Sequence, residues 1–269
     1  MRDTKSSFEK RHLPAATASA ALVASALLLA VSVKPCLAGA SGQTTFSSPD
    51  DASRALVSAV QEHDERAVGK ILGAGSELIS SDDKAEDTLE RERFVQKYQE
   101  MHRWVRESGG TTTLYIGAEN WPFPIPLVSR DGGWRFDSKT GSNEIQFRRI
   151  GENEMAAIGM CNTLVTAKTH PGSDSEADRL AKTLLPQIEG TSKPVLFQGY
   201  YFRILSNSGV GFAAIAYPAM YRSSGVMTFI ATQDGGVSER DLGSKTANIA
   251  GAMTTNHADA TWTPAESKP

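Results

Sequence analysis

The segment from Trp121 to Asp137, W-P-F-P-I-P-L-V-S-R-D-G-G-W-R-F-D, restricts the fold more than any other part of the chain. Its three alternating prolines lack backbone N–H groups, so residues 121–126 fit neither a helix nor a central strand. We therefore expect an extended arm, and its large side chains share one face because they alternate with the prolines: Trp121, Phe123 and Ile125.

The second half of this segment predicts a β-hairpin. Asp131-Gly132-Gly133 supplies residues that tolerate the positive φ angles of a tight turn, and Trp134 to Asp137 alternates apolar and polar side chains. Aromatic residues at alternate strand positions usually belong to a core, so we interpret the hairpin as the cap of a hydrophobic core. The alternative is an aromatic platform for a ligand, whose candidate residues are Tyr115, Trp121 and Trp134.

The N-terminus has the pattern of an export signal. Four basic residues precede an apolar run over residues 15–33, and the small residues Ala38-Gly39-Ala40 follow it. We predict a signal peptide at residues 1–38, followed by a flexible segment at 39–47, and a bacterial protein that is periplasmic or secreted. The apolar run is long, so an uncleaved anchor is the alternative and the only membrane contact that we expect.

Charge and cysteine content narrow the partners. The full chain carries 28 basic and 31 acidic residues, and removal of residues 1–38 takes away five basic and two acidic ones, leaving a net charge of −6. This balance argues against nucleic acid and anionic lipid as partners. Cys161 is then the only cysteine, so an intrachain disulfide is excluded and the fold depends on its core.

Three helices and a strand are predicted before the arm. The first helix begins at Ser48, an N-cap hydroxyl followed by proline, and the second runs from the cap Asp64 to Gly73. The third extends from about Ser81 to Arg106, and its apolar residues recur at helical spacing: Leu89, Phe94, Tyr98, Met101 and Val105. Thr111 to Ile116 is rich in β-branched residues and predicts the strand.

The second half reads as a long helix followed by strands. The helix begins at Ser142, with a kink near Gly151, and has a buried stripe of Met155, Ile158, Cys161, Leu164 and Val165. A weaker helix covers 176–188, with Pro186 limiting its end. An antiparallel meander and a short helix from Ser244 to Met253 follow, and the strands are 200–205, 211–217, 225–231 and a polar edge at 237–242.

These elements predict an α+β fold. Residues 48–141 form an N-terminal half of helices and antiparallel sheet, similar to the NTF2-like (cystatin-like) cone. Residues 142–264 form a half with a long helix and an antiparallel, pilin-like meander, and 265–269 are a polar tail. Both similarities are analogies of pattern and carry no function by themselves.

Several unusual words along the chain resemble the bacterial DUF2950 family over about residues 45–264. These words are W-P-F-P-I-P-L-V, D-G-G-W-R-F-D, R-R-I-G-E-N-E, G-Y-Y-F-R-I-L, Y-P-A-M-Y, S-G-V-M-T-F-I and D-L-G. The resemblance implies an exported protein without an assigned activity, so it supplies no catalytic residue. Family members usually have a longer segment before G-Y-Y-F-R-I-L than residues 169–198 of this chain.

No catalytic, metal or cofactor constellation emerges from the residues. Cys161 lies on the buried stripe of a helix, without a neighbouring base, and is interpreted as a structural thiol. The histidines after the signal lie far apart, so we predict neither a metal site nor a cofactor. One charged cluster, Arg148-Arg149 beside Glu152 and Glu154, is interpreted as a salt-bridge cluster, and the alternative is an anion-binding site that also uses Arg135 and Arg203.

The leading functional hypothesis is therefore a non-enzymatic binding or envelope-associated module. Its partner would be an envelope protein or a small ligand. One alternative is a hydrolase or isomerase with a pocket in the N-terminal cone, and a filled core would argue against it. A second alternative is a pilin-like assembly subunit.

Overall fold

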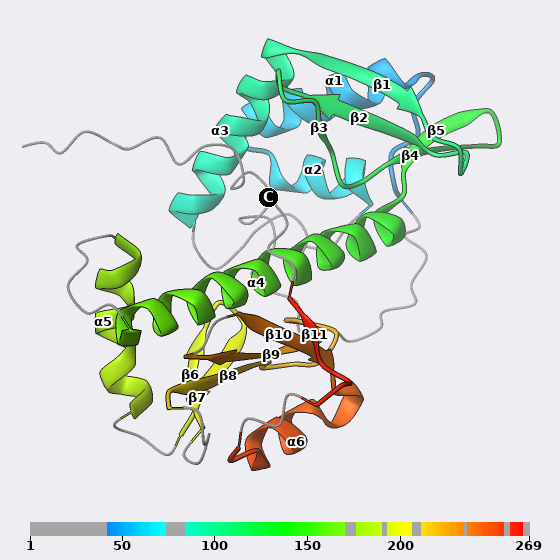
Figure 1. Ribbon diagram of the computed structural model, residues 1–269. Helices are drawn as coiled ribbons and strands as arrows, with labels where there is room; N and C mark the ends of the chain where they lie inside the picture. Colours follow the sequence, from blue (N-terminus) through cyan, green and yellow to red (C-terminus); the bar gives the residue numbers. More distant parts are fainter. Residues whose placement is uncertain are drawn as a thin grey trace, which may run out of the picture.

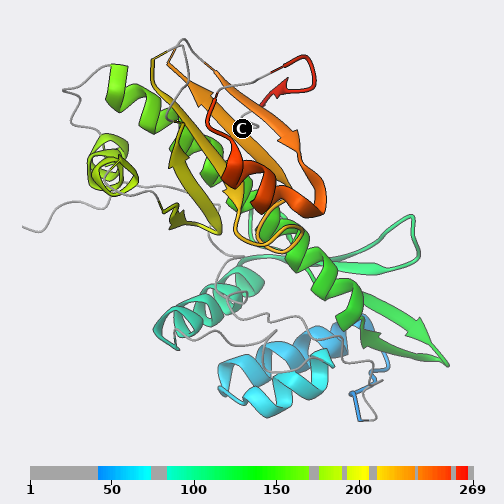
Figure 2. The ribbon, with the colours of Figure 1, turned by 90° about the horizontal axis from the view of Figure 1, so that it is seen from below.

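The computed structural model describes residues 42–73, 84–169, 176–189, 193–205, 211–233, 236–255 and 259–265. Figure 1 shows two lobes on opposite sides of one long helix, α4 (Ser138–Thr169), and Figure 2 shows the same arrangement from below. We call them the N-terminal lobe and the C-terminal lobe. The predicted signal peptide lies outside the described residues, and so do His170 and His257.

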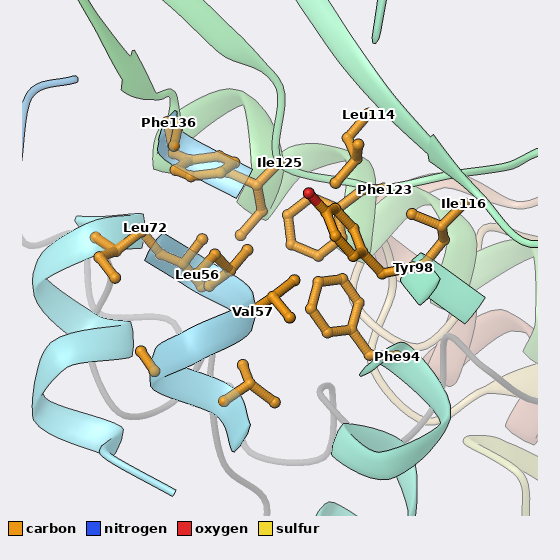
Figure 3. Close-up of a cluster of buried hydrophobic side chains, with 14 of the residues drawn as sticks. Leu56, Val57, Leu72, Phe94, Tyr98, Leu114, Ile116, Phe123, Ile125 and Phe136 are labelled. Carbon is orange, nitrogen blue, oxygen red and sulfur yellow. The ribbon is translucent and has the colours of Figure 1, made fainter. Parts of the chain in front are cut away.

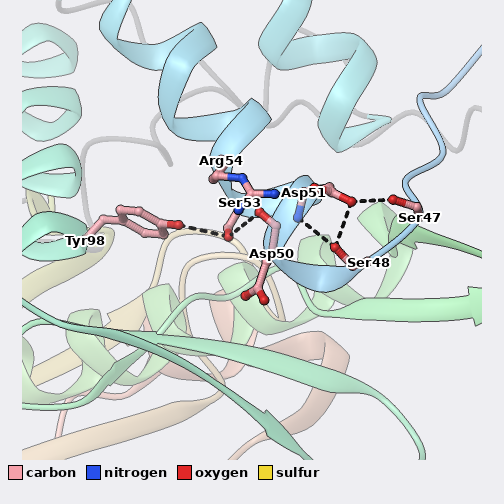
Figure 4. A network of polar contacts seen from close by, with 7 residues as sticks. All are labelled: Ser47, Ser48, Asp50, Asp51, Ser53, Arg54 and Tyr98. Carbon is pink, nitrogen blue, oxygen red and sulfur yellow. Dashed lines mark hydrogen bonds and ion pairs between the residues drawn. The ribbon is translucent and has the colours of Figure 1, made fainter.

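The first helix, α1 (Pro49–Gln61), begins as its sequence predicts. The Ser48 hydroxyl accepts a hydrogen bond of 3.1 Å from the Asp51 N–H. The Ser47 and Ser48 hydroxyls and the Arg54 guanidinium donate to the Asp51 carboxylate, which lowers the pKa of that group below its ordinary value (Figure 4). Leu56, Val57 and Val60 of this helix are buried.

Helix α2 (Glu65–Leu72) confirms the second prediction. The Asp64 carboxylate accepts a hydrogen bond of 2.9 Å from the Ala67 N–H, and the helix ends at Gly73 with φ of 67°. The residues before α1 contact this lobe, because Phe46 exchanges two backbone hydrogen bonds of 2.8 Å with Trp134.

The third helix is shorter than predicted, and this part of the prediction is wrong. Helix α3 (Lys84–Glu100) stops before His102, and β1 (His102–Arg106) pairs antiparallel with β2 (Thr112–Ile116). Helical spacing continues past residue 100, but five ladder pairs with β2 decide the conformation. Gly109-Gly110 therefore belongs to the turn between two strands and does not end a helix.

The remaining strands of the N-terminal sheet come from the proline arm and the hairpin. They are β3 (Trp121–Pro122), β4 (Leu127–Arg130) and β5 (Gly133–Phe136), and the path through the sheet is β1-β2-β4-β5, with β3 pairing β2. The predicted turn is confirmed, since Asp131 and Gly132 have φ of 53° and 78°.

The hairpin and the arm close the core of the N-terminal lobe. Phe123, Ile125 and Phe136 are buried and point toward side chains of α1, α2 and α3 (Figure 3). The Phe123 and Phe136 rings lie 6.1 Å apart at 71°, an edge-to-face arrangement that aromatic pairs favour. The interpretation of the hairpin as a core cap is thereby confirmed.

Helix α4 contributes to both cores. It starts four residues before the predicted Ser142 and runs without a break through Gly151. Ile145 belongs to the N-terminal core, whereas Cys161 and Leu164 belong to the C-terminal core. Met155 was predicted on the buried stripe, which is wrong, because it is 55% exposed.

The C-terminal lobe contains the predicted antiparallel meander, extended by one strand at each side. Its order is β11-β10-β9-β8-β7-β6. The strands are β6 (Val195–Phe197), β7 (Tyr200–Ile204), β8 (Ala213–Pro218), β9 (Met227–Thr232), β10 (Val237–Asp241) and β11 (Thr263–Pro264). Strand β10 pairs with β11, so the prediction of a sheet edge at 237–242 is wrong.

Two helices besides α4 accompany this sheet. Helix α5 (Glu176–Glu189) continues for three residues past Pro186, so the proline does not end it. Helix α6 (Thr246–Ala252) follows a short 3₁₀ helix, η3 (Gly243–Lys245), and begins without the predicted Ser244 cap. The two antiparallel sheets and their helices confirm the α+β class, while the NTF2-like and pilin-like comparisons stay predictions.

Candidate functional site

The aromatic residues predicted to bind a ligand lie on both faces of the N-terminal sheet. Trp121 and Trp134 are half-buried and pack against the N-terminal core. Tyr115 alternates with the buried Leu114 and Ile116, so it lies on the opposite face of β2. There the Arg103 guanidinium covers its ring at 4.8 Å.

Arg135 and Arg203 occupy different lobes. Arg135 alternates with the buried Phe136 on β5 and lies on the outer face of its sheet. Arg203 lies on β7, where its guanidinium donates to the carbonyl oxygens of Ala250 and Met253 at 2.6 and 2.5 Å. These carbonyls lie at the C-terminal end of α6, where a cation is favourable, so Arg203 stabilises a helix end.

Arg148 connects α4 to the proline arm. It donates to the Glu144 carboxylate at 2.7 Å and to the Pro122 carbonyl at 2.8 Å. Its guanidinium also lies 5.1 Å from the centre of the Trp121 ring, within the range of a cation–π contact. These three contacts use both the charge and the planar face of this side chain.

The next residues of α4 bind the connection between β8 and β9. Arg149 donates to the Ser223 carbonyl at 3.2 Å, and Asn153 donates to the Ser224 carbonyl at 2.8 Å. The Glu154 carboxylate accepts the N–H groups of Val226 and Met227 at 2.9 and 3.0 Å. Burial lowers the pKa of the Arg149 guanidinium, because a charged group is less favourable out of water.

Replacing Arg149 with alanine tests whether this contact is structural. We expect the free energy of unfolding to fall by about 1–2 kcal/mol, because the Ser223 carbonyl loses a charged donor. Arg130, exposed on β4, is the matched control, and its replacement by alanine should change stability by less than about 0.5 kcal/mol. Equal melting curves for the two variants would leave Arg149 available for the anion-binding hypothesis.

A surface pocket lies elsewhere, among the helices of the N-terminal lobe. It has a volume of about 50 Å³, and its surface is almost entirely apolar because most of its lining side chains are apolar. These are Leu56, Ala59, Val60, Val68, Leu72, Phe94 and Phe123. Three polar residues complete the lining: His63, Glu65 and Arg91.

The connection between α1 and α2 explains the position of this pocket. Helix α1 ends at Gln61, His63 takes a φ of 55°, and Asp64 caps α2, so only three residues separate the helices. This tight turn brings α2 back against α1, so Val60 and Val68 line the same pocket. Arg91 of α3 then donates to the Glu65 carboxylate at 3.0 Å and ties α3 to α2.

A groove of about 320 Å³ continues from the pocket along α1 and α3. It shares Val60, His63 and Arg91 with the pocket. Its other lining residues are mostly polar: Gln61, Glu92, Val95, Gln96 and Gln99. The site therefore joins an apolar hole to an open groove with both polar and apolar surface.

The titratable groups do not form a reactive set in this pocket. His63 and Glu65 are exposed, and the buried carboxylates Asp87 and Glu90 are absent from the described lining. Glu90 instead pairs with the Arg93 guanidinium at 2.7 Å. Among the residues that the structure describes, no three His, Cys, Asp or Glu side chains are grouped to hold a metal ion.

The thiol of Cys161 is not a candidate nucleophile. Cys161 is fully buried in the C-terminal core, and burial raises the pKa of its thiol to about 12. A thiol with so high a pKa does not form the reactive thiolate at neutral pH. The prediction of a buried structural thiol is confirmed.

Sequence reasoning missed the pocket and its groove. Helical spacing identified Phe94 as an apolar helix position, but no pattern indicated that this position borders a hole. In the described part of the chain, no helix has the length and apolar character that a membrane crossing requires.

Comparison with known proteins adds a family. Searches of curated proteins and of solved structures found no match. The sequence matches the family described as "Protein of unknown function (DUF2950)" over residues 43–182 and 173–265. The chain therefore belongs to the DUF2950 family.

Proposed function

We propose that the protein is a non-enzymatic binding module whose pocket between α1, α2 and α3 receives an apolar group of its partner. The observation that carries this proposal is the apolar lining of a pocket at the protein surface. Removing apolar surface from water stabilises a complex by roughly 25 cal/mol per Å², so such a pocket gains most from an apolar occupant.

The lining of the site favours a binding function over the enzyme alternative. Sites that enclose a small-molecule substrate usually have volumes of about 300–1,000 Å³, a range that the groove reaches and the apolar pocket does not. A hole of about 50 Å³ accepts a small apolar group, such as the end of one aliphatic side chain. Catalysis by general acid and base also requires a positioned titratable group at the reacting atom, whereas His63 and Glu65 are exposed to water.

The proposal also includes export of the protein from the cytoplasm. The basic, apolar and small residues of positions 1–40 support a signal peptide, and hence a periplasmic or secreted protein. The partner is then an envelope protein or a small ligand with an apolar end. The acidic charge of the chain after residue 38 is consistent with either of them.

The proposal is tested by binding an apolar probe to the pocket and by variants that fill the pocket with a larger side chain. Toluene is the probe, and we expect it to shift the amide resonances of Ala59, Val60 and Val68 in ¹H–¹⁵N spectra. Val68→Phe should remove these shifts, because the larger ring occupies the hole; Ala59→Leu is a second, milder filling variant. Toluene shifts that persist in both folded variants, or that occur elsewhere in the protein, would contradict the proposal.

A further inference from the structure

The groove beside the pocket points to one class of partner. Its walls carry three exposed primary amides, one from α1 and two from successive turns of α3: Gln61, Gln96 and Gln99. Each primary amide offers two donors and an acceptor with two lone pairs. A peptide backbone offers the same combination of N–H donors and C=O acceptors.

We propose that the site binds a peptide segment of a protein partner, with one apolar side chain in the pocket and the adjoining backbone along the glutamines. This inference rests on the proposed function, since it names the partner of the same pocket. The apolar hole supplies the anchor of the complex, and buried anchors dominate the energy of protein interfaces. Hydrogen bonds between the glutamine amides and the peptide backbone set the direction and the register of the bound peptide.

Other partner classes fit the groove less well. An acyl chain would use the hole but would leave the glutamines without a role. A phosphate or nucleic acid requires unpaired cationic groups, whereas Arg91 is paired with Glu65 at 3.0 Å and Glu92 adds a negative charge to the groove. The pocket, of about 50 Å³, suits the end of one aliphatic side chain, such as that of leucine.

Four probes separate these possibilities. They are the capped pentapeptide Ac-Ala-Ala-Leu-Ala-Ala-amide, its all-alanine analogue, N-acetyl-leucinamide and decanoate. We expect the leucine pentapeptide to bind at least about tenfold more tightly than N-acetyl-leucinamide, a difference of about 1.4 kcal/mol. Binding should also shift the side-chain NH₂ resonances of Gln96 and Gln99.

A double variant, Gln96→Ala with Gln99→Ala, isolates the groove. We expect it to lose the tenfold gain of the pentapeptide while toluene still shifts Ala59 and Val68. Both glutamines are exposed helix residues, so their replacement by alanine should leave the fold intact.

The outcomes distinguish this inference from the proposed function. Equal affinities for the pentapeptide and N-acetyl-leucinamide, tighter binding of decanoate, or equal binding of the all-alanine peptide would overturn the peptide inference. In each case toluene binding in the pocket would leave the proposed function standing. Absence of shifts in the pocket with every probe would overturn both.

Discussion

Replacing Phe136 with alanine is expected to lower the free energy of unfolding by about 3–5 kcal/mol. The ring is 1% exposed and packs edge-to-face on Phe123, so its removal leaves a cavity where the hairpin meets the helices. Most domains are stable by only about 5–15 kcal/mol, so this loss brings the N-terminal lobe close to unfolding at room temperature. Urea unfolding followed by circular dichroism measures the effect.

Phe147 provides the matched control for this experiment. It is a phenylalanine on α4, but 73% of it is exposed. Its replacement by alanine should change stability by less than about 0.5 kcal/mol, because few contacts are lost. Similar losses for the two variants would contradict the assignment of Phe136 to the core.

A second large effect is expected at Gly225, in the connection that α4 binds. A Cβ atom there would lie 2.1 Å from the Tyr200 hydroxyl oxygen and 2.5 Å from its ring carbon Cζ. The Tyr200 ring is fully buried, and its hydroxyl donates to the Met227 carbonyl at 2.9 Å, so the ring has little freedom to move. We expect Gly225→Ala to cost about 2–3 kcal/mol in thermal or urea unfolding.

Replacing Gly159 with alanine should have the opposite effect and stabilise the protein. This glycine lies inside α4, and apart from its chain neighbours and the backbone of the helix itself no atom lies within 4 Å of the Cβ that alanine would add. Alanine in a helix interior is favoured over glycine by about 0.5–1 kcal/mol, so Gly159→Ala should raise the melting temperature. Destabilisation by both variants would indicate that backbone effects, and not the contact with Tyr200, determine the result at Gly225.

The sequence predicted those elements whose boundaries depend on local chemistry. Ser48 and Asp64 cap their helices with their own side chains, and Asp131-Gly132 takes the positive φ angles that the turn requires. Strand β1 could not be found in this way, since residues 102–106 continue the helical spacing of α3. Their conformation depends on a partner strand that begins six residues later.

The candidate site could not be predicted from the sequence, because it also depends on contacts between elements. An apolar residue on a helix stripe looks the same whether it fills a core or borders a hole, because the difference lies in the spacing between helices. Val60 and Val68 illustrate this, since both match the core pattern and both line the pocket. Gln96 and Gln99 are likewise exposed polar residues of a helix, which the sequence pattern alone does not connect with a groove.

Several sequence motifs that resemble the DUF2950 family contact one another in the structure, although they are far apart in the sequence. Arg149, Asn153 and Glu154 of R-R-I-G-E-N-E bind backbone groups of Ser223 to Met227, most of which lie in S-G-V-M-T-F-I. Arg148 of the same word binds the Pro122 carbonyl of the proline arm. The residues of R-R-I-G-E-N-E thus connect α4 both to the proline arm and to the C-terminal lobe.

The long helix has a practical consequence for dissecting the protein into pieces. A fragment that stops before residue 148 lacks Arg148, which binds the Pro122 carbonyl of the arm, and one that starts after residue 146 lacks the Gln146 amide that donates to the Arg222 carbonyl. Any cut therefore has to duplicate a stretch of the shared helix in both fragments. Each fragment then keeps the residues of α4 that its own lobe contacts.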